Sequence, residues 1–244
     1  MRKVRILAAL GLLAAATAAN AEISSTWTLT NDYDFRGITQ SAKDPAVQAS
    51  LDYAHESGWY IGGWASNVDF CGDDADPDCL DPSYELDLYT GFSGGEEGGL
   101  GWDVGLVYYT YEESDLNYPE IYGKLNYGMF SGALFYSNDY VNSSENAFYI
   151  SGDVSVPLPQ NFSITAHAGY SFGDFWDGPP GDSGSDYLDY SVGVGYTVGH
   201  FDLGLKYVDT SLDDGDFAFS RDDVFNSEGR VVFSVATTFP WGEK

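Results

Sequence analysis

The sequence predicts an all-β protein, a transmembrane antiparallel β-barrel of about 12 strands that follows a cleaved leader. Three observations predict this fold: an export-type leader, apolar residues that recur at every second position, and connections that alternate between short and long. After residue 21 no apolar stretch approaches the roughly 18 residues of a membrane helix. A membrane span in this chain would therefore be a closed barrel of strands.

Residues 1–21 have the three parts of a secretory signal peptide. The basic segment "MRKVR" precedes the apolar run "ILAALGLLAAATA", and Ala19-Asn20-Ala21 is a small-x-small cleavage signal. We therefore expect export, with a mature chain that begins at Glu22; a cut after Ala18 is the alternative. Residues 22–244 are expected to form the barrel as one domain.

The composition is both acidic and aromatic. The 244 residues include 38 Asp and Glu against 10 Lys and Arg, a formal net charge of -28, and three of those bases lie in the leader. Disordered acidic chains lack aromatic residues, whereas this one carries 19 Tyr, 15 Phe and 6 Trp, which indicates a folded protein. A charge of this sign argues against a nucleic-acid partner and attracts cations.

Alternation at period two locates the strands. In "YELDLYTGF", residues 84–92, Tyr84, Leu86 and Leu88 share one face, and Glu85 and Asp87 share the other. Two strands with less clean alternation are expected near 59–70 and 129–137. The remaining expected strands lie within 27–35, 47–53, 102–108, 121–127, 148–156, 162–170, 188–196, 201–207 and 231–239.

The connections between these strands alternate strictly in length. Short ones are expected at 56–58, 94–99, 127–128, 157–161 and 198–200, and long ones at 36–45, 69–82, 112–120, 137–145, 173–186 and 209–228. Outer-membrane barrels place short turns on the periplasmic rim and long loops outside. Most acids fall in the long connections, so the outer rim is expected to be anionic.

A secreted β-sandwich or a lipocalin-like soluble barrel would show the same alternation. It would have to bury the Trp and Tyr side chains, whose polar atoms then need partners. In a membrane barrel these residues face lipid and gather in interfacial girdles near strand ends. Trp27, Trp59, Trp102, Tyr196 and Trp241 lie near expected short turns or the chain end, which favours the membrane barrel.

Four segments of the mature chain carry a resemblance to a known family: "YDFRGITQ" (33–40), "LDYAHESGWYIGGWASNVDF" (51–70), "YELDLYTGF" (84–92) and "GRVVFSVATTF" (229–239). On these segments the chain resembles the TorF-like porin family of proteobacterial outer-membrane proteins. The resemblance implies a Gram-negative outer-membrane location, contact with membrane lipid, and a pore role without catalytic residues. Such barrels commonly end on the aromatic residue that the barrel assembly machinery reads, whereas "PWGEK" follows Phe239 here.

The face opposite the lipid-facing residues is expected to line the lumen. Arg36 is expected at the outer end of the first strand, where Gly37 lets the chain turn away. It either pairs with Asp34 or a loop acid and pins the first loop, or it belongs to a constriction whose charges set ion selectivity. The lumen and constriction candidates are Arg36, Asp32, Asp34, Asp52, Glu85, Asp87, Asp103, Lys124, Lys206 and Arg230.

The two cysteines, Cys71 and Cys79, fall within one expected external loop. In an exported chain this spacing predicts a disulfide that ties the loop. Asp74, Asp76, Asp78 and Glu85 also match EF-hand positions, but Cys79 replaces the required Gly, Pro77 intervenes and Glu85 belongs to a strand. A solvated acidic loop is therefore favoured over a metal site, and loose divalent-cation binding near lipopolysaccharide is the alternative.

Enzyme motifs are absent from the sequence. No "GxSxG", "HExxH" or phosphate-binding glycine loop is present, and His167, with Ser163 and Thr165 on its face, is expected to fill the lumen. We therefore expect no enzyme and no cofactor, but a passive channel with an acidic lumen that favours cations or small cationic solutes. The alternative is a closed barrel, filled by side chains such as Tyr89 and Tyr109, whose acidic loops bind divalent cations or a partner.

Overall fold

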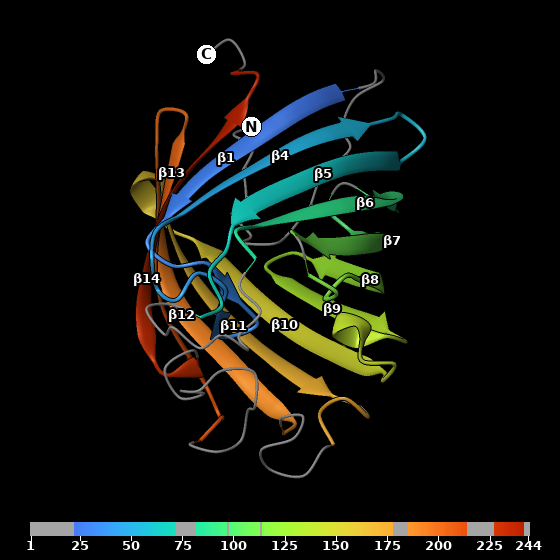
Figure 1. Ribbon diagram of the computed structural model, residues 1–244. Coiled ribbons are helices and arrows are strands. Elements are labelled where there is room, and N and C mark those ends of the chain that lie inside the picture. The colour runs from blue at the N-terminus through green and yellow to red at the C-terminus, as the bar shows by residue number, and fades with distance from the viewer. Residues whose placement is uncertain are drawn as a thin grey trace.

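Twelve strands close into an antiparallel barrel in which β1 pairs with both β4 and β14 (Figure 1). The computed structural model describes residues 22–71, 82–96, 98–112, 114–177, 185–213 and 227–241. The predicted signal peptide, residues 1–21, lies outside these ranges and stays a prediction. The barrel strands are β1 (Glu22–Thr30), β4 (Ala46–Ala54), β5 (Trp59–Asn67), β6 (Tyr84–Gly95), β7 (Leu100–Tyr111), β8 (Tyr118–Tyr127), β9 (Phe130–Ser137), β10 (Ala147–Pro157), β11 (Phe162–Phe172), β12 (Tyr187–Val198), β13 (Phe201–Thr210) and β14 (Arg230–Phe239).

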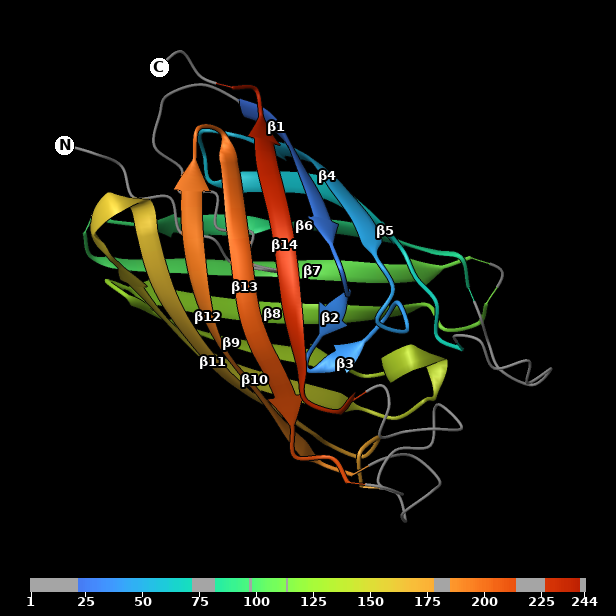
Figure 2. The same cartoon turned by 90° about the vertical axis from the view of Figure 1, so that its left-hand side faces the viewer.

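The predicted barrel, its strand number and its alternating connections are confirmed. Short turns join β4 to β5, β6 to β7, β8 to β9, β10 to β11 and β12 to β13 at one end of the barrel, which we call the short-turn end. The strand ends that the long connections join lie at the opposite end, the long-loop end, where β2, β3 and η1 are also found (Figure 2). Two one-turn 3-10 helices, η1 (Tyr140–Asn142) and η2 (Pro159–Asn161), lie in connections. Within the described ranges, no helix has the length and apolar character needed to cross a membrane.

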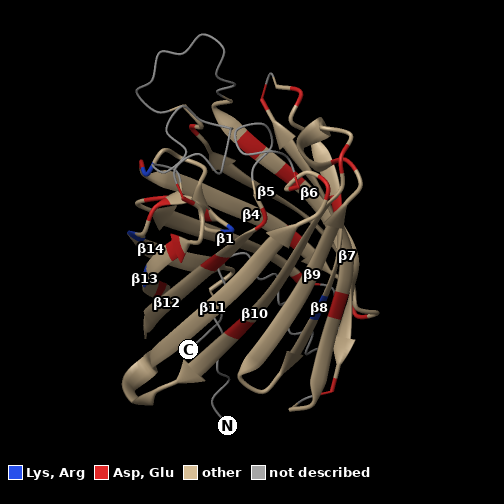
Figure 3. Cartoon of the chain, turned by 90° about the horizontal axis from the view of Figure 1, so that it is seen from below, with Lys and Arg blue, Asp and Glu red and all other residues tan. Residues whose placement is uncertain are grey.

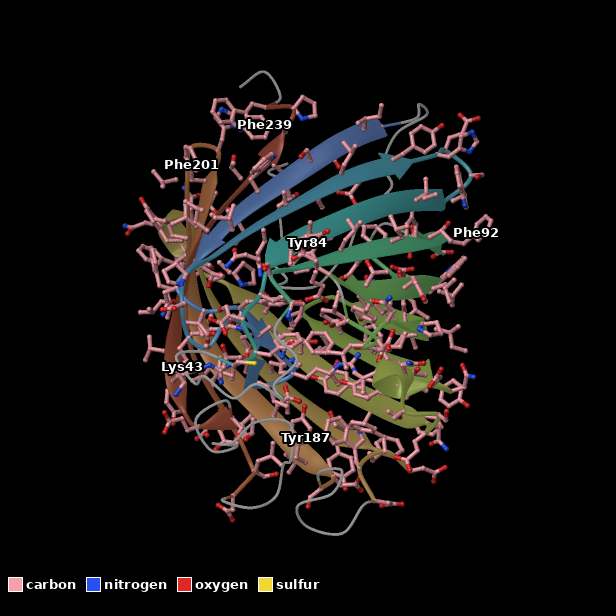
Figure 4. All side chains as sticks on the ribbon, in the orientation of Figure 1. Lys43, Tyr84, Phe92, Tyr187, Phe201 and Phe239 are labelled. Carbon is pink, nitrogen blue, oxygen red and sulfur yellow. The ribbon has the colours of Figure 1, made fainter. Side chains whose placement is uncertain are left out.

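The outer surface of the barrel is a continuous apolar wall. Leu29, Leu51 and Leu88 are each more than half exposed, as expected for side chains that face lipid. Figure 4 shows Phe92, Phe201 and Phe239 at the short-turn end. Of the predicted girdle residues, Trp27, Trp102 and Trp241 are exposed.

Acidic residues are concentrated at the long-loop end, away from the N and C labels (Figure 3). Several of these acids lie on the connections, among them Asp139 and Glu145 between β9 and β10. This distribution agrees with the anionic outer rim expected from the sequence.

The first strand is shorter than predicted. β1 ends at Thr30, and the chain turns into the barrel to form a separate two-stranded sheet, β2 (Asp34–Phe35) and β3 (Ile38–Thr39). We call residues 31–41 the inner hairpin; β2 and β3 lie beside the lower half of β14 in Figure 2. Apolar and polar residues alternate in this segment as in a strand, but its apolar side chains face the interior of the barrel instead of lipid. Tyr33, for example, is only 2 % exposed.

Candidate functional site

The inner hairpin turns at Arg36 and Gly37, which both have positive φ angles of 52° and 84°. Two such residues in succession are typical of a type I′ turn. The turn lies against β12 and β13, because a Cβ added at Gly37 would lie 2.4 Å from Thr210 Cγ2 and 2.8 Å from Asp189 Cβ. Only glycine therefore fits this turn, both for its φ angle and for its close approach to the barrel wall.

Arg36 reaches across the lumen to Glu120 on β8. Its Nη1 and Nη2 donate to Glu120 Oε1 and Oε2 at 2.9 and 2.7 Å, a bidentate pair with both side chains buried. The guanidinium also lies 4.3 Å from the ring centroid of Tyr149 and 5.1 Å from that of Phe135. The inner hairpin, and not the first strand, places Arg36 inside the barrel, and of the two expected partners, Asp34 or an acid of a long connection, the structure shows the second kind. The hairpin brings Arg36 to Glu120. The sequence placed this acid in the long connection 112–120, and the structure places it on β8.

Asp34 and Asp32 bind the two bases of β13 and β14 instead. Arg230 donates through Nε to Asp32, through Nη2 to Asp34 Oδ1 at 2.7 Å, and through Nη1 to the carbonyl of Gly37 at 2.7 Å. Lys206 Nζ donates to Asp34 Oδ2 at 2.7 Å. Burial acts to raise the pKa of Asp34, but Lys206 and Arg230 outweigh it and hold this pKa below its ordinary value. Ion pairs thus fasten the inner hairpin to three sides of the barrel.

His167 joins two aspartates on the lumen wall. Its Nδ1 lies 2.7 Å from Asp153 Oδ1, and its Nε2 lies 2.8 Å from Asp189 Oδ1 and 3.0 Å from the Tyr149 hydroxyl. A ring with a carboxylate at both nitrogens donates at both, which makes the imidazolium the form that fits. His167 lies inside the lumen as expected. Its partners come from neighbouring strands, however, and no local signal pointed to them because Asp153 and Asp189 lie 14 and 22 residues away.

The remaining candidates lie on the walls of β4 to β8. Asp103 Oδ1 accepts from the Tyr60 hydroxyl at 2.5 Å, and Asp52 accepts from Ser50 and Tyr89. The Lys124 ammonium lies 4.5 Å from the ring centroid of Tyr122. These residues face the lumen as predicted, but the structure does not bring Asp52 or Asp103 to the Arg36 group.

Glu85 and Asp87 are buried on the inward face of β6, with exposed fractions of only 1 % and 4 %. Tyr111 donates to Glu85 Oε1 at 3.2 Å. Among the described side chains, neither of these two carboxylates has a Lys, Arg or His partner in an ion pair. Glu85 therefore belongs to the barrel wall, as the strand prediction required.

Aromatic side chains fill the long-loop half of the lumen. Tyr109 stacks on Tyr118 at 4.6 Å, and Tyr140 packs against Tyr118 and Phe175 at 4.7 and 4.8 Å between ring centroids. We call this group, with Trp176 and Tyr187, the aromatic plug. The inner hairpin packs on it, since Phe35 lies 5.9 Å from Tyr109 and the Tyr187 hydroxyl donates to the Arg36 carbonyl.

The short-turn half of the lumen is lined differently. Its inward positions on β11 to β14 are small or hydroxylated and only half-buried, namely Ser163, Thr165, Gly193, Gly204, Ser234 and Ala236. Small side chains leave room between the walls of a barrel of this size. The β11–β14 wall of this half is therefore more open and polar than the packed outer half, whereas the facing wall carries the buried Tyr60, Tyr122 and Asp103.

Two predicted features of the long connection after β5 remain open. Cys79 of the predicted disulfide, and the weak metal candidates Asp74, Asp76 and Asp78, lie outside the described residues. The disulfide stays a prediction. Within the described residues, no group of three or more His, Cys, Asp or Glu side chains is arranged to hold a metal ion.

Comparison with known proteins places the chain in a family. A family model described as "Bacterial protein of unknown function (Gcw_chp)" matches residues 14–239. The chain belongs to this family. Its name differs from the TorF-like family that the sequence resembles, and that resemblance stays a proposal. A search of curated proteins found no match.

Solved structures of porins share the fold. The KdgM porin aligns with a TM-score of 0.52 and 8% identity over 90% of this chain and 99% of its own. The NanC porin aligns with a TM-score of 0.52 and 9% identity over 90% of this chain and 100% of its own. A complex of the KdgM porin with disordered oligogalacturonate has the same TM-score at 9% identity, over 91% and 99% of the two chains.

The protein is therefore a β-barrel of the Gram-negative outer membrane with a porin-like fold. Its own apolar outer wall agrees with this location. At these identities the likeness concerns the fold, and the chemistry of the lumen has to be argued from this chain's residues.

Proposed function

We propose that the protein is a porin-type channel that passes cations or small cationic solutes by passive diffusion through an acidic lumen. The observation that carries this proposal is the charge of the more open half of the lumen. Asp52 and Asp202 face this half and accept hydrogen bonds from hydroxyl groups, while Asp153 shares His167 with Asp189 and has a side chain that is 46% exposed. Carboxylates on a pore wall lower the energy of a passing cation and raise that of an anion.

Most basic side chains of the lumen form ion pairs with acidic ones. Arg36, Arg230 and Lys206 each form an ion pair at 2.7 Å, so their charge is compensated locally. Lys124 lies half-buried against Tyr122. The charge that is not balanced by an ion pair in the lumen is therefore negative. This supports a cation-selective channel over a non-selective one.

The sign of the lumen charge also bears on which solutes this channel passes. The KdgM porin has been solved in complex with disordered oligogalacturonate, which is a chain of acidic sugars. A lumen lined with carboxylates repels such a polyanion. We propose that this chain shares the barrel with that porin but carries solutes of the opposite charge.

The inner hairpin and the aromatic plug make the outer half of the lumen the narrow part of the path. They support a gated channel, in which the hairpin must shift for larger solutes to pass. The same packing supports a second candidate function, a closed barrel that binds divalent cations or a partner at its acidic loops. Membrane lipid, lipopolysaccharide and the barrel assembly machinery are proposed partners in either case, and neither candidate is an enzyme.

Conductance of the refolded protein in a planar bilayer tests the proposal. A potassium chloride gradient should give a reversal potential of the sign for potassium selectivity, and Asp52→Asn with Asp153→Asn should reduce it. The control Asp139→Asn with Glu145→Gln removes the same charge from the β9–β10 connection and should change it less. Oligogalacturonate should not block the current. Absence of conductance from verified folded protein would refute the channel and leave the closed barrel.

A further inference from the structure

Glu85 and Asp87 are two adjacent, deeply buried acids of the lumen that have no Lys, Arg or His partner among the described side chains. Glu120 is paired with Arg36, Asp32 and Asp34 with Arg230, and Asp153 and Asp189 with His167. Glu85 and Asp87 are as deeply buried as any of these. Tyr111 is a described side chain that donates to Glu85, at 3.2 Å from its Oε1.

Among the residues that the structure describes, one oxygen of each carboxylate makes no hydrogen bond. These buried atoms are Glu85 Oε2 and Asp87 Oδ1, while Glu85 Oε1 accepts from Tyr111. The two residues stand two positions apart on the same face of β6, and their carboxyl groups lie close enough to interact directly. Two unpaired, buried and adjacent negative charges are strongly unfavourable, because neither water nor a base offsets the loss of hydration. Either one of the two carboxyl groups keeps a proton, or a cation lies between them.

The surroundings of the pair supply more oxygen atoms. Tyr33 of the inner hairpin packs on Trp64, with 5.3 Å between ring centroids, and Trp64 stands opposite Asp87 in the register of β5 and β6. Tyr111 stands opposite Glu85 in the strand register, and Tyr109 stands opposite Asp87. Carboxylate and phenol oxygens are hard ligands, the kind that calcium and magnesium prefer.

A shared proton would neutralise only one of the two charges, whereas a divalent cation neutralises both. Magnesium demands octahedral geometry and keeps several of its waters, which suits an open site. Calcium accepts irregular oxygen geometry at longer distances and therefore suits a buried one.

We propose that Glu85 and Asp87 bind one calcium ion inside the barrel, through the two carboxylate oxygens that make no hydrogen bond among the described residues. The phenol oxygens of Tyr33 and Tyr111 complete the protein's share of the site. The ion joins β6 to the start of the inner hairpin, so it stabilises the packed outer half of the lumen. The proposed site uses no residue of the segment 72–81 and does not depend on conduction.

Terbium luminescence tests the site in the refolded full chain. Terbium replaces calcium at oxygen sites and is sensitised by nearby tyrosine rings, of which this site has three. We expect a terbium signal that calcium displaces, and its loss in Glu85→Gln with Asp87→Asn. The control Asp139→Asn with Glu145→Gln removes two acids from a connection and should keep the signal.

Thermal unfolding gives a second readout. With a dissociation constant of about 0.1 mM, about 10 mM calcium should raise the unfolding temperature of the wild type by about 5 °C or more. The double variant removes two buried charges, so it should fold, and its unfolding temperature should not respond to calcium. An equal response of the double variant would overturn the site, and so would a wild type that shows neither response, which would leave a shared proton. Bilayer conductance, measured separately, decides the channel whichever result is obtained here.

Discussion

The substitution Arg36→Ala tests whether the inner hairpin controls the lumen. It removes the bidentate pair and leaves the Glu120 carboxylate, only 1% exposed, without its cation. Loss of one partner from a buried pair costs about 3–5 kcal/mol. The ring contacts of the guanidinium add about 0.5–2 kcal/mol, while the Tyr109 hydroxyl, 3.0 Å from Glu120, still donates to it.

This cost falls on the docking of the hairpin and not on the barrel, whose strands pair independently of β2 and β3. The lower bound of about 3 kcal/mol shifts the ratio of docked to released hairpin by roughly 100-fold. We therefore expect more frequent or larger conductance steps in single-channel recordings, together with stronger cation preference, because Glu120 becomes available to ions.

The matched control is the double variant Arg36→Ala with Glu120→Gln. It removes the uncompensated charge and should recover part of the docking energy, so the two substitutions should not be additive. If Arg36→Ala gives wild-type currents and shows no coupling to Glu120→Gln, the hairpin does not gate the lumen and the reasoning fails.

Three further predictions address the same region. Gly37→Ala should release the hairpin, because it combines a positive φ angle with contacts to Thr210 and Asp189; Gly98→Ala has the same φ problem with no atom within 4 Å and should leave the currents unchanged. The ion pairs of Asp34 lower its pKa in the folded protein below the ordinary value of 3.8. These ion pairs therefore stabilise the docked hairpin fully at pH values above 3.8. The stabilisation is lost as the pH falls through the lower pKa of the folded protein. Hairpin release should therefore begin only below about pH 4 and should lose part of its pH dependence in Asp34→Asn, as measured by protease accessibility of the hairpin. His167→Gln removes a positive charge between two aspartates and should move the reversal potential further toward the potassium value; an unchanged potential would show that this cluster does not face the ion path.

Much of the fold follows from local features of the sequence. Alternation at period two in "YELDLYTGF" and its counterparts predicts each strand, since successive side chains of a strand point to opposite faces whatever its neighbours are. Turn length fixes which strands are adjacent and at which end they meet. The odd or even position of a residue along its strand then predicts which face it lies on. Inward-facing residues of this kind are Asp52, Glu85, Asp87, Asp103 and Lys124.

The tertiary structure alone decided which residues meet inside the barrel. Arg36 binds Glu120 84 residues away, and Arg230 binds Asp32 198 residues away. Such pairs depend on closure of the barrel and on a first strand that stops at Thr30, so that residues 31–41 turn into the lumen. Alternation continues through both strand and hairpin, so the sequence could not separate them. The sequence thus determined the barrel and its inward faces, while packing across the lumen determined the inner hairpin, the ion pairs and the burial of the two adjacent acids, because contacts across a closed barrel have no local sequence signal.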